Sequence, residues 1–132
     1  MKRPRRFVAL ALLLALPVLA CGGSGADIPA LATAAADVAP ASSFNVVARN
    51  TRFDTDTIVA TADQEVIISL ENQDGALHNI AIYSEEGGDA IFRGELFTGP
   101  ETMEYRFDAP PPGVYYFRCD AHPEMEGAFI AR

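Results

Sequence analysis

Strict alternation of apolar and polar residues over strand-length runs is the feature that most constrains the fold of this chain. In residues 102–107, Met103, Tyr105 and Phe107 alternate with polar residues, a pattern typical of a half-buried strand. Met103 is therefore interpreted as a core residue and not as a metal ligand. Residues 108–113 (DAPPPG) contain three prolines and a glycine, which cannot lie in a central strand and predict a turn.

The alternation restarts after this turn, in residues 114–119 (VYYFRC). Tyr115, Phe117 and Cys119 share one face of the predicted strand, and Arg118 marks the opposite face as the wetter one. Cys119 is therefore predicted to point into the core.

An earlier run, residues 77–83 (LHNIAIY), places His78 on the same face as Ile80 and Ile82. A histidine on an apolar face can be a hydrogen-bonded core residue, and a buried cysteine can be a small apolar residue. Both side chains are also candidate metal ligands, brought to the core by different strands.

The remaining patterns complete an all-β prediction. Residues 66–70 (VIISL) form a short apolar run consistent with a buried strand. Residues 84–100 are charged and glycine-rich, which indicates a long connection with one helical turn near residues 89–93. Several short strands without a strong amphipathic helix predict a single-domain Greek-key β-sandwich.

The N-terminus has the layout of an export signal. Residues 1–6 (MKRPRR) are basic, and residues 7–20 are apolar but shorter than the roughly 20 residues that a membrane-spanning helix needs. Residues 18–20 followed by Cys21 resemble the lipobox of bacterial lipoproteins, which predicts a removed lipoprotein-type signal peptide (1–20) and a lipid-modified Cys21. The alternative is an ordinary secreted protein in which Cys21 has no role.

The composition changes near residue 43. Residues 21–43 are rich in Ala, Gly, Ser and Pro, which predicts a flexible linker after the lipidated cysteine. All aromatic residues except Phe7 lie from Phe44 onward, so the domain is predicted to span residues 44–132.

The charge of the chain excludes nucleic-acid binding. The formal net charge is −8, and removing the four basic residues of the signal lowers it to −12. Such a surface repels nucleic acid and favours encounter with basic partners, although it can equally serve only solubility.

Three potential ligands, Cys119, His122 and Met125, recur at steps of three residues. Residues three apart on a strand face opposite sides, so they can bind one metal only if the chain turns tightly after Cys119. If Cys21 is the anchor, Cys119 has no disulfide partner, and His78 is the one other histidine in the chain. A thiolate, two imidazoles and a thioether form a soft set that indicates copper.

Residues 113–127 together with residues 66–83 resemble the cupredoxins, the family of plastocyanin, pseudoazurin and amicyanin. The resemblance covers essentially the whole domain. It implies a type 1 copper site in which Asn79, outside the ligand set, joins the two ligand segments and directs a backbone N–H to the sulfur. The ligands that it implies are His78 (buried), Cys119 (thiolate), His122 (near the surface) and Met125 (axial).

Electron transfer is the predicted function, and the chain is not expected to be an enzyme because no histidines remain for a second, water-open metal centre. The alternative is a copper-binding protein that delivers copper to an exported or membrane oxidase. We expect a monomer on the periplasmic or extracellular side of a membrane, held by its lipid anchor. The expected redox partner is a basic cytochrome or a membrane oxidase, docked at an acidic loop that carries Asp120, Glu124 and Glu126.

Overall fold

The computed structural model describes residues 26–132, which form one short helix and ten strands. In chain order these are α1 (Ile28–Ala34), β1 (Ser43–Ala48), β2 (Thr57–Ala60), β3 (Glu65–Asn72), β4 (Leu77–His78), β5 (Ala81–Tyr83), β6 (Ala90–Arg93), β7 (Phe97–Thr98), β8 (Glu101–Asp108), β9 (Gly113–Arg118) and β10 (Glu126–Ala131). Within this part of the chain, no helix has the length and apolar character that a bilayer crossing requires.

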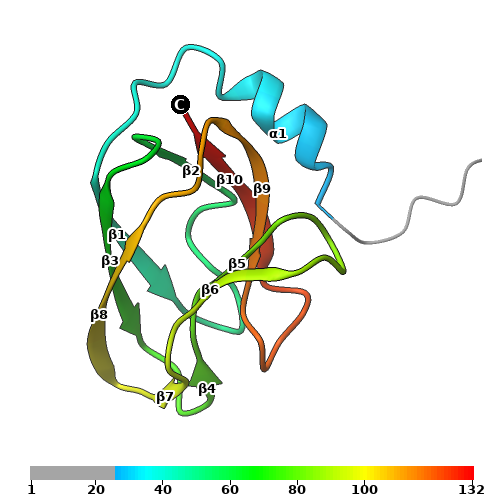
Figure 1. The fold of residues 1–132 in the computed structure, drawn as a ribbon. Helices are drawn as coiled ribbons and strands as arrows, with labels where there is room; N and C mark the ends of the chain where they lie inside the picture. The colour runs from blue at the N-terminus through cyan, green and yellow to red at the C-terminus, as the bar shows by residue number, and fades with distance from the viewer. Residues whose placement is uncertain (1–25) are drawn as a thin grey trace, which may run out of the picture.

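Two sheets face each other across the core (Figure 1). The first has the order β1-β3-β8, with β1 parallel and β8 antiparallel to β3. The second has the order β2-β10-β9-β5-β6, in which β2 runs parallel to β10 and the other pairs are antiparallel. The pair β4 and β7 lies at one end of the sandwich. The prediction of an all-β sandwich is confirmed.

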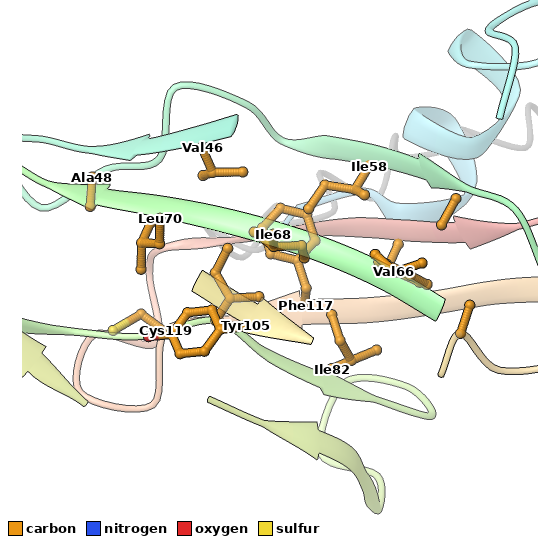
Figure 2. Packing of buried hydrophobic residues seen from close by; sticks show 14 of the residues in the cluster. Val46, Ala48, Ile58, Val66, Ile68, Leu70, Ile82, Tyr105, Phe117 and Cys119 are labelled. Carbon is orange, nitrogen blue, oxygen red and sulfur yellow. The ribbon is translucent and has the colours of Figure 1, made fainter. Parts of the chain in front are cut away.

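The core fills the space between the sheets. On β3, Val66, Ile68 and Leu70 have no exposed surface, whereas Ile67 and Ser69 between them are partly exposed. This alternation is the pleat of a strand with one face on the core. Figure 2 shows buried side chains from both sheets in this packing, including Val46, Ile58, Ile82, Tyr105, Phe117 and Cys119.

Strand β8 confirms the alternation read from the sequence. Tyr105 is buried, and Met103 and Phe107 on the same face pack against the core. On β9, Phe117 faces the core as predicted, but Tyr116 on the supposedly wetter face is also buried. The reason is that Tyr116 is covered by neighbouring side chains, among them Ile28 from the N-terminal segment.

The residues before β1 form a helix that packs on the outer face of the second sheet (Figure 1). Asp27 caps α1 by accepting a hydrogen bond from the Ala30 backbone N–H at 3.2 Å. Ile28 and Leu31 line the helix face toward the sheet, and Ala35 after the helix is buried against β2 and β10.

The C-terminal residue holds the other end of this segment. The Arg132 guanidinium donates to the carbonyl oxygens of Ala35, at 3.0 Å, and of Val38. Residues 28–34 of the predicted flexible linker (21–43) thus form a helix held on the domain, because Ile28, Leu31 and Ala35 pack on the second sheet. The predicted signal peptide and Cys21 lie outside the described residues.

The helical turn expected near residues 89–93 is also wrong, because β6 occupies this position and pairs antiparallel with β5. Phe92 explains the difference. Its ring stacks on Phe107 with centroids 4.3 Å apart and meets Tyr105 edge-on at 6.0 Å. The extended chain thus anchors the edge of the sheet to the core.

Candidate metal centre

The C-terminal candidate residues lie in a tight turn between β9 and β10. Cys119 follows β9, has no exposed surface and is a free cysteine in the described part of the chain. Its backbone N–H donates to the Met125 carbonyl, and the Met125 N–H donates to the His122 carbonyl, both at 2.9 Å. These two bonds reverse the chain within seven residues, as the spacing of the three candidates requires.

His78 reaches the same place from the β4-β7 pair at the end of the sandwich. It lies in β4, opposite Phe97 of β7, and its side chain has no exposed surface. His78, Ile80 and Ile82 are fully buried, but Asn79 and Ala81 between them are buried as well, so the whole segment is enclosed and its burial does not show an alternating pattern.

Three donor atoms converge at the end of the sandwich. The Cys119 Sγ lies 3.7 Å from Nδ1 of His78 and 3.9 Å from Nδ1 of His122. The two imidazole rings have centroids 4.7 Å apart, and the donor atoms of all three residues lie within 4.8 Å of one another.

These separations can be compared with those around a bound metal. A metal that holds an imidazole nitrogen at about 2.0 Å and a thiolate sulfur at about 2.3 Å, about 120° apart, places the two atoms roughly 3.8 Å from each other. The distances of 3.7 and 3.9 Å are therefore those expected if one metal were held by the thiolate and the two imidazoles. A set of two imidazoles and one thiol is the trigonal set of a blue copper site.

Met125, the fourth candidate, is 2% exposed and belongs to the same buried cluster as Cys119. Its backbone bonds to Cys119 and His122 keep it within the ligand turn. Met125 is thus buried in the turn that also carries Cys119 and His122, and its thioether is the soft donor available there.

Asn79 connects the two ligand segments. Its side-chain oxygen accepts the Asp120 backbone N–H at 2.8 Å, and its Nδ2 donates to Asp120 Oδ2 at 3.1 Å and to the Gly94 carbonyl at 2.8 Å. Among residues 26–132 the expected hydrogen bond from the Asn79 backbone to the sulfur is not formed. Asn79 therefore acts on the ligand turn through its side chain.

Two acidic residues of the expected docking loop are engaged inside the protein. The Asp120 carboxylate accepts the Tyr83 hydroxyl and lies 3.7 Å from the Arg118 guanidinium. The Glu126 carboxylate accepts the Tyr116 hydroxyl and, at 2.6 Å, the backbone N–H of Ala26.

Of the three acidic residues of the loop, only Glu124 is therefore available to a partner, because it is exposed and forms no hydrogen bond in the described part of the chain.

The contact between Glu126 and Tyr116 also affects the tyrosine. Burial, and to a smaller extent the hydrogen bond to the Glu126 carboxylate, raises the pKa of Tyr116 well above its usual value.

Asp74 is a residue of this site that the sequence reasoning missed. Its Oδ2 lies 3.0 Å from Nε2 of His78, and its carboxylate also accepts the backbone N–H groups of Asn50 and Thr51. The N–H groups of Thr51 and Asn50, with a smaller effect of His78, hold the pKa of the Asp74 carboxyl below its usual value. The one available signal was the turn sequence NQDG (72–75), in which Asp74 lies four residues before His78.

Comparison with known proteins agrees with this arrangement. The chain matches the family model of the cupredoxin-like domain over residues 11–131. Amicyanin from Paracoccus versutus is 30% identical to it, with a TM-score of 0.51, over 74% of this chain and 88% of that chain. No curated protein sequence matches the chain.

Two auracyanins share the fold at lower sequence identity. A dithionite-reduced auracyanin from the photosynthetic bacterium Roseiflexus castenholzii is 18% identical with a TM-score of 0.63, over 71% of this chain and 99% of that chain. Auracyanin A, a blue copper protein from Chloroflexus aurantiacus, is 22% identical with a TM-score of 0.61, over 71% of this chain and all of that chain (100%).

Proposed function

The chain belongs to the cupredoxin-like domain family, and from this premise we propose that it transfers single electrons through one type 1 copper ion. The proposed ligands are His78, Cys119, His122 and Met125. The observation that carries the proposal is the convergence of two imidazole nitrogens, at 3.7 and 3.9 Å, on one unpaired thiol. Auracyanin A, with the same fold, is described as a blue copper protein.

In this function the protein fixes the positions of its donor atoms and shields them from water. Copper, when bound, supplies a one-electron Cu(II)/Cu(I) couple. His78 and Cys119 have no exposed surface, and Met125 is 2% exposed, so water has little access to the site from their side. Donors fixed by strands and a hydrogen-bonded turn rearrange little when the charge at the site changes, which keeps electron exchange fast.

His122 provides the route to a partner. Its side chain is partly exposed, whereas His78 and Cys119 are fully buried. Electron tunnelling falls steeply with distance, so a partner that docks over His122 approaches the site most closely. We expect the transfer rate to depend on ionic strength through the exposed Glu124 if the partner is basic.

Copper delivery, the alternative function, lacks a supporting feature in residues 26–132. A delivery protein usually exposes clustered methionines or histidines that can release the metal. Here both histidines belong to the site, Met125 is buried, and Met103 packs against the core.

The direct test is the spectrum of the purified protein with copper(II) added. We expect an intense blue absorption from thiolate-to-copper charge transfer that disappears on reduction and returns on oxidation. Cys119→Ser removes this band, while Met103→Leu, a matched change at a core methionine, leaves it intact. A folded wild-type protein that binds no copper contradicts the proposal, and rapid loss of copper(I) to a chelator favours delivery.

Export and membrane attachment are separate proposals that rest on the sequence. Residues 1–20 and Cys21 lie outside the described residues, and lipidation at Cys21 would hold the domain at the outer side of a membrane. Mass spectrometry of the membrane-bound protein should find an acylated Cys21 at its N-terminus. A Cys21→Ser variant should be released in soluble form.

A further inference from the structure

We propose that Asp74 is a positioning residue that orients His78 for copper and lowers the reduction potential of the site; this inference rests on the proposed function. Asp74 lies in the turn between β3 and β4. Its carboxylate faces the side of the imidazole opposite the cysteine.

The two ring nitrogens of His78 have different partners. Nε2 lies 3.0 Å from Asp74 Oδ2, and Nδ1 lies 3.7 Å from Cys119 Sγ. A carboxylate can only accept a hydrogen bond, so the ring proton belongs on Nε2. The lone pair of Nδ1 is then free to bind a metal, without a change of tautomer.

The carboxylate is itself held from a third segment. Asp74 Oδ1 accepts the Asn50 N–H at 2.8 Å, and Oδ2 accepts the Thr51 N–H at 2.9 Å. Asn50 and Thr51, with φ values of 54° and 55°, are the central residues of a tight turn closed by backbone hydrogen bonds between Arg49 and Arg52, and both of their N–H groups point to the Asp74 carboxylate. The loop after β1 thus holds a negative charge against the imidazole.

The turn that carries Asp74 cannot shift easily. The fully buried Asn72 accepts the Asp74 N–H at 2.9 Å and donates to the carbonyls of Ala76 and Phe97, at 2.9 and 3.0 Å. A Cβ on Gly99 would lie 2.1 Å from the Asn72 carbonyl oxygen, so the turn packs directly on that glycine. The orientation of His78 is therefore set before any metal binds.

The charge of Asp74 determines the direction of the effect on potential. A carboxylate that accepts Nε2–H makes the imidazole a stronger donor through Nδ1. Stronger donation stabilises copper(II), the more highly charged state, relative to copper(I). The reduction potential is therefore lower than it would be with an uncharged acceptor.

The experiment compares Asp74→Asn with Asp54→Asn by redox titration of the copper-loaded protein. Asp54 is a matched control, because its carboxylate also accepts a backbone N–H, that of Val47 in β1 at 2.8 Å, and makes no hydrogen bond with His78 in the described part of the chain. We expect Asp74→Asn to weaken the preference for copper(II) over copper(I) about tenfold, equivalent to a rise of about 59 mV for a one-electron couple. We expect Asp54→Asn to leave the potential at the wild-type value.

If the reduction potential shifts no more in Asp74→Asn than in Asp54→Asn, the proposed effect of Asp74 on the potential is overturned. If both variants are still blue, the proposed electron-transfer function is unaffected by that result. The absence of blue copper in the wild type removes both together. Positioning is decided separately by nitrogen NMR of the metal-free wild type, which should find the His78 proton on Nε2. A proton on Nδ1 overturns the role of Asp74 even if Asp74→Asn does not fold.

Discussion

Replacing Asn79 by alanine tests whether its side chain joins the two ligand segments in the metal-free protein. Asn79 is 1% exposed and makes three hydrogen bonds, two with Asp120 and one with the Gly94 carbonyl. Bonds between neutral groups contribute about 1 kcal/mol each and a bond to a charged group about 2 kcal/mol. Their loss should lower the free energy of unfolding of the metal-free protein by roughly 4 kcal/mol.

The assay is urea unfolding of the metal-free protein followed by circular dichroism, because the chain contains no tryptophan for fluorescence. Asn45→Ala is the matched control: this exposed residue of β1 makes no side-chain hydrogen bond in the described part of the chain, and its change should stay within about 0.5 kcal/mol. A loss below about 1 kcal/mol in Asn79→Ala would refute the idea that this side chain joins the ligand segments.

Three further outcomes are expected from the packing and the ligand chemistry. Gly127→Ala should lower the free energy of unfolding by about 1–3 kcal/mol in urea titrations, because the new Cβ would lie 2.2 Å from the Asp56 carbonyl oxygen. Gly75→Ala is the control and should have little effect, because a Cβ at that position meets nothing within 4 Å. Burial raises the pKa of Tyr105 and Tyr116, so above about pH 10 the unfolded chain loses phenol protons that the folded protein keeps. Below that pH these groups make a constant contribution to the free energy of unfolding. Above it the free energy of unfolding should fall, by at most about 1.4 kcal/mol per pH unit for each phenol. The fall should be shallower in Tyr116→Phe, which lacks one of the two phenols. Met125→Leu should retain copper, keep the blue band and raise the potential measured by redox titration.

Strand faces could be predicted because alternation is a local property of the sequence. The β8 residues Met103, Tyr105 and Phe107 face the core for the reason that the period of two predicts. The prediction failed where packing between distant segments overrides the local pattern. Phe92 draws its segment into β6, and Ile28 covers the face of β9 that was expected to be wet.

The electrostatic interpretation of the ligand turn changed for the same reason. Asp120, Glu124 and Glu126 look equivalent in the sequence, as three acidic residues beside the candidate ligands. In the fold, Asp120 is bound by Tyr83 and Glu126 by Tyr116, from strands β5 and β9. Glu124 alone of the three keeps an exposed, unbonded side chain.

The sequence by itself determined the strand pattern and the types of donor atom, because side-chain alternation and the softness of sulfur and imidazole need no knowledge of the fold. Only the tertiary structure decided which groups surround those donors. Asp74 meets the loop at Asn50, 24 residues away, and Glu126 meets Ala26, 100 residues away. Contacts between residues so far apart leave no periodic pattern in the chain, and they arise only when strand pairing and packing bring distant segments together.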